Sequence, residues 1–300
     1  MLPLVEMFCV HLESEGRSPK TIEWYRASLG KFAAWLQGSE HPQDPEDWTA
    51  NTLRAYVVAL RRMAKPDGLP LSATSVATYT RSLRAFCRWL EVEEFASANP
   101  MAKVKAPTAP KLVKPVLSND EARAVLSAAK AGRNGLRDEA LILFLLDTGA
   151  RAGEVCGLKE ADIQWGQHLA KLYGKGAKER YVPFSAPTMK AMQRYALRAR
   201  IDGPAFFLSE EGGRLSPSGL LQLCQRIGDR AGVSLNPHKL RHTFAISYLR
   251  AGASVFALQK TLGHSSLDMS LRYAALMTDD LVIAHKANSP VVALMGSSKR

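Results

Sequence analysis

The chain has 300 residues, 46% of them hydrophobic, which is enough to bury a substantial core in about two domains. Lys and Arg outnumber Asp and Glu by 40 to 28, and the net charge of +12 favours a polyanionic partner. No run approaches the roughly 18 apolar residues of a membrane span, and no signal peptide opens the chain, so we expect a cytoplasmic protein without a membrane partner.

The cysteines and histidines lack the spacing of a metal site. Four scattered cysteines stand mostly among apolar residues and are expected to be buried thiols, namely Cys9, Cys87, Cys156 and Cys224. The sequence has no HExxH pattern and no glycine-rich phosphate loop. We therefore expect neither a metal nor another cofactor.

Four amphipathic patterns predict helices in the first hundred residues. They cover residues 4–16, a stretch opened by Ser18 and Pro19, residues 49–63, and residues 72–90. On the last helix, Arg81, Arg84 and Arg88 line a face away from the apolar positions. Such a stripe suits either a solvated surface or a helix that follows a phosphate backbone.

A proline- and lysine-rich stretch then separates two domains. Residues 99–117 contain four prolines and no acidic residue, which predicts an extended linker whose Lys103 and Lys105 suit a polyanion. Up to residue 110 the chain has 13 Lys and Arg against 12 Asp and Glu, whereas the remainder has 27 against 16. We place the domains at 1–103 and 117–290, with a linker at 104–116 and a tail at 291–300.

The second domain reads as mainly helical with one strand signal. A capped helix begins at Ser118, and a buried helix is interrupted at Gly149 before a second one. Residues 168–184 predict a hairpin, and from Ser216 onward the pattern is helical again. The expected fold is thus mainly α, with a small antiparallel sheet in the second domain.

Two short motifs place arginines at helix starts. In "NPHKLRHTFA", Asn236 caps a helix on which His238 and Arg241 project side by side. In "DTGARAGEVCGL", Arg151 opens a helix and Glu154 lies one turn on, where its carboxylate could hold a guanidinium. Taken alone, the first motif is equally consistent with a helix cap, whereas the second alone favours an ordinary helix salt bridge.

Two further motifs carry a lysine, a histidine and a tyrosine. The turn "GKGAKE" exposes Lys175, with Lys178 as a competing candidate, while "LGHSSLDMSLRYAAL" carries His264 and Tyr273. Tyrosine ordinarily has a pKa of about 10, so ionising it at pH 7 costs roughly 4 kcal/mol, and Tyr273 alone reads as a core aromatic. Together the motifs supply what a tyrosine needs for attack on a phosphodiester without a metal: fixed cations and an imidazole base.

In order and context these motifs resemble the catalytic signature of the tyrosine recombinases, the family of Xer, Cre and lambda integrases. The resemblance runs from about residue 8 to residue 285 and includes "FCVHLESEGRSPKTIEWYRASLGKFAAWL", which looks like the family's N-terminal helices. It implies a helical, SAM-like core-binding domain and a mixed α+β catalytic domain that close around DNA. Its six catalytic positions correspond to Arg151, Lys175, His238, Arg241, His264 and Tyr273.

The resemblance implies a role for each position. Tyr273 would attack the scissile phosphate to give a 3′-phosphotyrosine, with Arg151 and Arg241 on the non-bridging oxygens and Glu154 ordering the site. His238 would act as acid and base, Lys175 would protonate the leaving 5′-oxygen, and His264 would donate a hydrogen bond to the phosphate. The expected partner is double-stranded DNA with an inverted-repeat core site. We expect the protein to be a monomer in solution and to form a homo- or hetero-tetramer on the DNA.

Two positions depart from the family pattern. Ala275 stands where a histidine often follows the nucleophile, and Gly153 where a serine is common. Two alternative functions stay open: a tyrosine-type topoisomerase, which uses nearly the same residues, and a DNA-binding accessory factor that has lost catalysis. The expected role is site-specific recombination through a Holliday junction, in Xer-type resolution or the integration and excision of mobile elements. We also expect the apolar C-terminal tail to dock on a neighbouring protomer.

Overall fold

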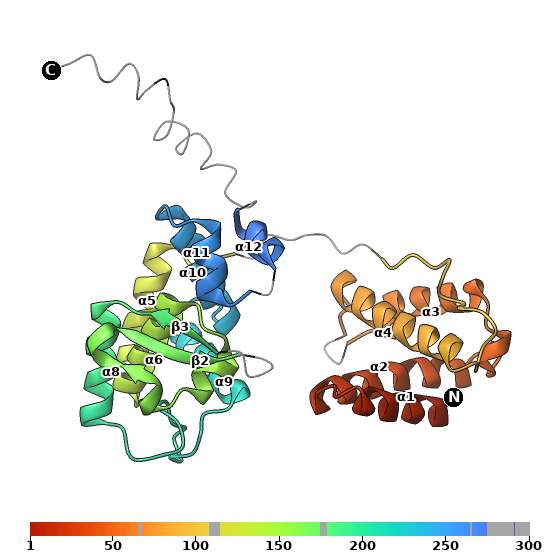
Figure 1. The fold of residues 1–300 in the computed structure, drawn as a ribbon, viewed down its shortest axis with the longest axis horizontal. Helices are drawn as coiled ribbons and strands as arrows, with labels where there is room; N and C mark the ends of the chain where they lie inside the picture. The colour runs from red at the N-terminus through yellow and green to blue at the C-terminus, as the bar shows by residue number, and fades with distance from the viewer. Residues whose placement is uncertain (66–67, 108–114, 175–178, 265, 275–290, 292–300) are drawn as a thin grey trace. The chain divides into compact units, whose positions relative to one another are not determined.

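The structure is a computed structural model, and it describes residues 1–65, 68–107, 115–174, 179–264, 266–274 and 291, without the side chains of 268, 272 and 274. The chain divides into two compact units, residues 1–112 and 113–300 (Figure 1). Each unit has its own hydrophobic core. Among the described residues, no helix has the length and apolar character needed to cross a membrane.

The N-terminal unit is a bundle of α-helices. Its elements are α1 (Leu2–Ser14), α2 (Pro19–Gln37), the 3-10 helix η1 (Pro45–Asp47), α3 (Ala50–Arg62) and α4 (Ala73–Val92). The predicted start of α2 is confirmed, because the Ser18 hydroxyl accepts a hydrogen bond from the Thr21 amide at 3.3 Å and Pro19 follows. All four predicted helices are present.

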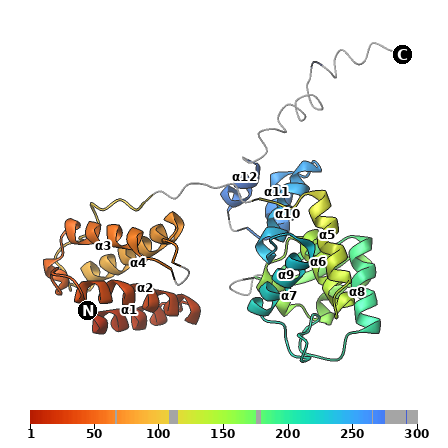
Figure 2. The same cartoon turned by 180° about the vertical axis from the view of Figure 1, so that it is seen from behind.

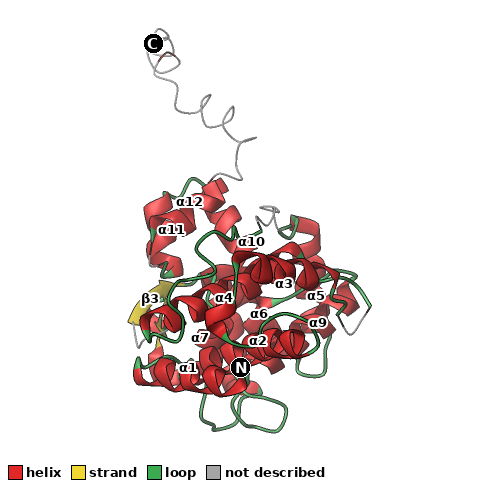
Figure 3. Ribbon diagram, turned by 90° about the vertical axis from the view of Figure 1, so that its right-hand side faces the viewer, coloured by secondary structure: helices red, strands yellow, loops and turns green. Residues whose placement is uncertain are grey.

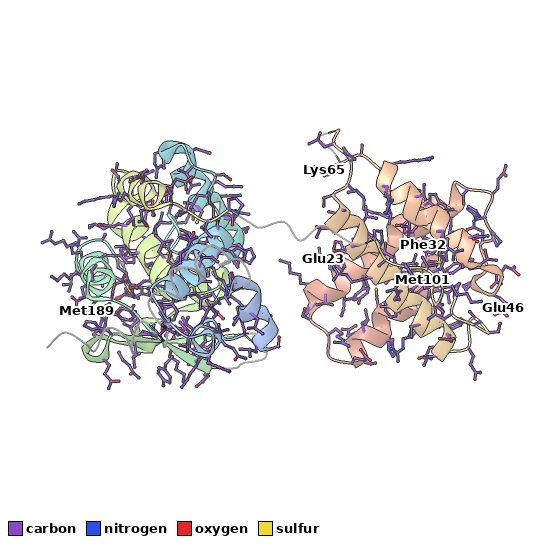
Figure 4. The ribbon with its side chains drawn as sticks, turned by 90° about the horizontal axis from the view of Figure 1, so that it is seen from above. Glu23, Phe32, Glu46, Lys65, Met101 and Met189 are labelled. Carbon is purple, nitrogen blue, oxygen red and sulfur yellow. The ribbon has the colours of Figure 1, made fainter. Side chains whose placement is uncertain are left out.

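Aromatic and aliphatic side chains from all four helices fill the core of this unit. Phe32 is fully buried, and Met101 lies with it inside the bundle (Figure 4). Val104, which we placed at the start of the linker, is 4% exposed and packs in the same core. Arg84 holds this position, donating from Nη2 to the Val104 carbonyl at 2.6 Å. The extended segment therefore stays attached to the N-terminal unit at least as far as Val104.

The second unit combines helices with one small sheet (Figures 2 and 3). Its helices are α5 (Asn119–Lys130), α6 (Gly135–Thr148), α7 (Ala152–Gly157), α8 (Ala186–Arg198), α9 (Pro217–Ala231), α10 (Pro237–Arg250), α11 (Val255–Leu262) and α12 (Leu267–Ala274). Two 3-10 turns, η2 (Glu160–Asp162) and η3 (Trp165–Gln167), flank the first strand. The mainly α fold with a small sheet is as the sequence predicts.

The sheet has three antiparallel strands in the order β1 (Ile163–Gln164), β2 (Leu169–Tyr173) and β3 (Glu179–Pro183). The hairpin of β2 and β3 is confirmed, with Leu172 opposite Arg180. The two-residue strand β1, paired with β2 through Ile163 and Ala170, was not predicted, because two residues are too few to show an alternating pattern.

Helix α6 forms the centre of this unit and packs against α5, α8 and α10. Leu141, Phe144 and Leu145 on it are completely buried. The four cysteines of the chain are all buried free thiols, as expected. This core fixes the end of α6 and the start of α7, where the candidate site begins.

Candidate active site

One large cavity of the second unit gathers most of the residues that the motifs single out. It has a volume of about 1190 Å³ and is lined by residues of α9 and by the five candidates Arg151, His238, Arg241, His264 and Tyr273. These five come from the start of α7, from α10, from the end of α11 and from α12. Segments far apart in the sequence thus bring arginine, histidine and tyrosine to one wall.

Gly149 creates the sharp turn that presents Arg151. It ends α6 in the left-handed conformation, with φ +60°, and an added Cβ would collide with the ring of Phe244. Arg151 then caps α7. Its backbone N–H donates to Glu154 Oε2 at 2.7 Å, and its Nη1 donates to Glu154 Oε1 at 2.9 Å. The Arg151 side chain remains 40% exposed and faces the cavity.

Glu154 is buried and also binds a second arginine that sequence reasoning missed. Arg180 on β3 donates from Nη1 and Nη2 to the two oxygens of Glu154, at 2.5 and 2.7 Å. Burial pushes the pKa of Glu154 upward, but the hydrogen bonds from Arg180 and Arg151 outweigh it and hold the pKa below its ordinary value. One buried carboxylate is thus shared by two guanidinium groups, which leaves one positive charge in excess.

The C-terminal end of α11 holds three arginines. Arg180 Nε donates to the carbonyl of Thr261 at 2.9 Å, Arg241 Nη2 to that of Leu262 at 2.9 Å, and Arg151 Nη2 to that of Gly263 at 3.1 Å. Carbonyls in the last turn of a helix lack partners within the helix, and the helix dipole favours cations there. The end of α11 therefore fixes three cations, two of which, Arg151 and Arg241, line the cavity.

Arg241 is the most deeply held of these arginines. It is 5% exposed, and besides Leu262 it donates from Nη1 to the Gly149 carbonyl at 2.5 Å. Burial, with the nearby charge of Arg151, lowers the pKa of Arg241 to about 10, which still leaves it charged at neutral pH. Its side chain reaches the cavity wall with its orientation fixed.

Three aromatic rings lie in contact beside Arg241, and two of them, those of His238 and Tyr273, line the cavity. His238, exposed at the start of α10, lies edge-on to His242 with ring centroids 4.3 Å apart, and His242 lies 5.3 Å from Tyr273. We did not single out His242 from the sequence, although it follows Arg241 directly. Its position four residues after His238 on the same helix was the available signal.

His264 and Tyr273 form the far side of the site. His264 is 8% exposed, and its Nδ1 lies 2.8 Å from the hydroxyl of buried Ser270. Burial and then the charges of Arg241, Arg151 and Arg180 lower the pKa of His264 to about 4, so the ring is neutral at pH 7. Burial also raises the pKa of Tyr273, although Arg241 and Arg151 oppose the rise.

Several predicted site residues lie elsewhere. Lys175, its competitor Lys178, and Ala275 fall outside the described residues. Exposed positions of the N-terminal unit carry the five proposed DNA-contacting residues, Arg81, Arg84, Arg88, Lys103 and Lys105. Around Gly153 an added Cβ would meet open space, so the serine common at this position would fit. Within the described part of the chain, no group of His, Cys, Asp and Glu has the arrangement of a metal site.

Family models match both units of the chain. Residues 5–94 match "Phage integrase, N-terminal SAM-like domain", and residues 115–279 match "Phage integrase family". The tyrosine recombinase XerD of Bifidobacterium longum (strain NCC 2705) is 30% identical over 305 residues, covering 96% of this chain and 97% of the relative.

Solved structures show the same fold. The crystal structure of XerA recombinase matches with a TM-score of 0.53 and 25% identity, covering 96% of this chain and 98% of that one. A lambda integrase tetramer bound to a Holliday junction matches with a TM-score of 0.70 and 20% identity, covering 88% of this chain and 77% of that one. The family matches and the 30% identity to the XerD relative over 96% of this chain show that the chain belongs to the phage integrase family of tyrosine recombinases.

Proposed function

We propose that this chain is a site-specific DNA recombinase that cuts and rejoins strands through a 3′-phosphotyrosine intermediate and a Holliday junction. The observation that carries the proposal is the convergence of Arg151, Arg241, His264 and Tyr273 on one cavity. The named relatives are tyrosine recombinases, and the lambda integrase neighbour was solved on a Holliday junction.

In the proposed reaction the hydroxyl oxygen of Tyr273 attacks the phosphorus of the scissile phosphate. A bond forms between that oxygen and phosphorus while the bond to the 5′-oxygen breaks, so the phosphodiester energy is kept in the protein–DNA link. The phenolic proton passes to His238, and the departing 5′-oxygen takes a proton from Lys175. Attack by a 5′-hydroxyl on the phosphotyrosine reverses these steps and joins the strands.

Charge stabilisation falls to the fixed cations. Arg151 and Arg241 line the cavity and present planar N–H groups, which suit the non-bridging oxygens of a phosphate as negative charge develops on them. His264, neutral at pH 7, would donate one hydrogen bond to the same phosphate. Glu154 would act through Arg151, to which it is bonded.

The N-terminal unit supplies the proposed contacts with DNA phosphates. Arg81 and Arg88 project from the exposed face of α4, and Lys103 and Lys105 follow it. Arg84 belongs to the same face, although one of its donors already holds the Val104 carbonyl. We further propose that the DNA carries an inverted-repeat core site, that the protein is a monomer in solution, and that four protomers, identical or from two recombinases, assemble on the DNA.

A nicked suicide substrate that carries the DNA flanking the native gene tests the proposal. Wild-type protein should form a covalent adduct that survives denaturing electrophoresis, and Tyr273→Phe should form none while still binding the DNA. An adduct with Tyr273→Phe would refute the assignment of the nucleophile. Binding without any adduct would indicate an accessory factor instead. On a closed circular plasmid, in a separate assay, relaxation of supercoils without strand exchange would indicate a topoisomerase.

A further inference from the structure

Arg180 is bound by several hydrogen bonds beside the site, yet the proposed reaction gives it no step. Arg180 is 12% exposed and does not line the cavity, yet it is a cation at an inward-facing position of β3. Three of its N–H groups are bonded to protein, two of them to Glu154 and one to Thr261. It therefore acts on other residues of the site and not on a substrate.

The carboxylate of Glu154 is divided between two arginines. Oε1 accepts from Arg180 Nη1 and Arg151 Nη1, while Oε2 accepts from Arg180 Nη2 and the Arg151 backbone N–H. Arg180 makes the two-pronged pair that a guanidinium and a carboxylate prefer. The Arg151 side chain consequently donates to Glu154 from one nitrogen only. Its second terminal nitrogen, Nη2, donates to the Gly263 carbonyl, and its remaining N–H groups are available to the cavity.

Without Arg180, the pairing of Glu154 would change. A carboxylate that is 5% exposed cannot stay half-paired at low cost, so it would turn to form its own two-pronged pair with Arg151. That pair would draw the Arg151 guanidinium towards the protein interior and neutralise its charge. The two arginines compete for one buried anion, and in this structure Arg180 holds the stronger geometry.

We infer that Arg180 is a positioning residue of this active site: by occupying both oxygens of Glu154, it prevents that carboxylate from capturing Arg151 and keeps the Arg151 guanidinium available to a phosphate. The inference rests on the proposed function, because it assigns Arg151 a phosphate to bind. Arg180 also ties β3 to the last turn of α11 through Thr261. An added Cβ on Gly263 would lie only 2.9 Å from Arg180 Cδ, so the backbone before His264 is in close contact with this side chain.

Single-turnover cleavage of the nicked substrate tests the inference, with either an ordinary phosphodiester or an uncharged methylphosphonate at the scissile position. We expect Arg180→Met to cleave the phosphodiester about 10²-fold more slowly than wild type, the size of effect seen when one charge-stabilising donor is lost. On the methylphosphonate, which has less charge to stabilise, the loss should shrink to about tenfold or less. Arg180→Lys should fall between, because lysine restores the charge without the two-pronged pair.

A second substitution distinguishes two causes of a slow Arg180→Met variant: the pairing of Glu154 with Arg151, and a general loss of order in the site. Glu154→Gln cannot form a charged pair with Arg151, so the double variant Arg180→Met with Glu154→Gln should cleave faster than Arg180→Met alone. Arg200→Met is the matched control, because Arg200 is 11% exposed and paired with Glu160 at 2.8 Å, yet it is absent from the cavity wall. It should cleave at close to the wild-type rate.

Two results would overturn the inference: an equal loss for Arg180→Met on both substrates, or a double variant slower than Arg180→Met. Should Arg180→Met fail to fold, Arg180→Lys and the double variant carry the same comparison. Failure of the proposed function is recognised separately, since then wild-type protein forms no adduct on either substrate, and the inference falls with it.

Discussion

The rings of His264 and Tyr273 lie nearly parallel, 7° apart, with centroids separated by 6.1 Å. His264 is held from behind by Ser270, and Tyr273 packs in a small apolar cluster with Phe244 and Leu262. Before DNA binds, the proposed nucleophile is therefore a buried aromatic whose pKa is raised by that burial. Tyr273 therefore has the core position that its sequence context indicated, and the proposed catalytic role would be carried by the same side chain.

Replacing Arg241 by lysine should slow cleavage strongly. One ammonium cannot reach both the Gly149 and Leu262 carbonyls, and the burial that lowers the pKa of Arg241 to about 10 would lower that of a lysine further. We expect single-turnover cleavage to fall about 10²- to 10³-fold, with partial recovery as pH is lowered from 9 to 7. Arg194→Lys, at an ion pair with Glu139 elsewhere in the unit, is the control. A loss of less than tenfold in Arg241→Lys would contradict this prediction.

Removal of the Ser270 hydroxyl should impair His264. Because the pKa of His264 is about 4, the ring is neutral at pH 7, and donation from Nε2 to a phosphate requires Ser270 to donate to Nδ1. We expect Ser270→Ala to cleave about tenfold more slowly, which corresponds to one hydrogen bond. Ser28→Ala removes another buried hydroxyl, bonded to Ser82 in the N-terminal unit, and should cleave normally. Equal rates for the two variants would show that Ser270 does not act through His264.

The folded protein should lose stability in acid partly through His264. Its pKa is about 4 when folded against an ordinary value of 6.5, so between these values only the unfolded chain takes up a proton. The contribution is complete above pH 6.5 and is lost progressively as pH falls from 6.5 to 4. At pH 5 we expect a loss of about 1–2 kcal/mol. Urea unfolding of wild type and His264→Gln at pH 7.5 and pH 5.0 measures it, since other groups titrate alike in both proteins. If both proteins lost the same free energy of unfolding between pH 7.5 and pH 5.0, groups other than His264 would cause the acid sensitivity.

Gly263→Ala should destabilise the fold more than Gly232→Ala. Both glycines end helices in the left-handed conformation, with φ +62° and +67°, so both substitutions carry a strain of about 1 kcal/mol. Only at Gly263 does the new methyl group also meet a side chain, that of Arg180 at 2.9 Å, whereas at Gly232 nothing lies within 4 Å. Chemical denaturation should show an additional loss of about 1–2 kcal/mol for Gly263→Ala. Matching losses would mean that Arg180 moves aside freely.

Lys175 and Lys178 can be separated by a substrate whose 5′-leaving oxygen is replaced by sulfur. A thiolate leaves without a proton, so the variant that lacks the general acid should be rescued on this substrate. We expect Lys175→Ala to regain a cleavage rate close to wild type, while Lys178→Ala should show no selective rescue. The opposite pattern would assign the general acid to Lys178.

Local signals in the sequence predicted the helices well. Ser18, Ser118 and Asn236 each precede a helix and accept a hydrogen bond from its first turn, and such short-range chemistry is readable from neighbouring residues. Arg151 and Glu154 were found for the same reason, since their bond spans three positions. Their spacing alone predicted only a helix salt bridge, and the resemblance to the tyrosine recombinases indicated a catalytic role for Arg151.

Arg180 could not be found in this way. Its partners Glu154 and Thr261 lie 26 and 81 positions away, and only the fold brings them together. The one local signal was a charged residue on the inward side of a strand, alternating with buried Val182. Ser270 was missed similarly, because a serine in an amphipathic helix gives no sign that its hydroxyl meets a histidine.

The three arginines at the end of α11 have one more consequence. A free arginine side chain loses about 2 kcal/mol of rotamer entropy when it is immobilised. Here Arg180 and Arg241 are immobilised by carbonyls and a carboxylate as the protein folds, and Arg151 is tethered by the same groups. Much of that entropy is therefore lost during folding, so in the proposed reaction a DNA phosphate would meet Arg151 and Arg241 already in place at the cavity wall.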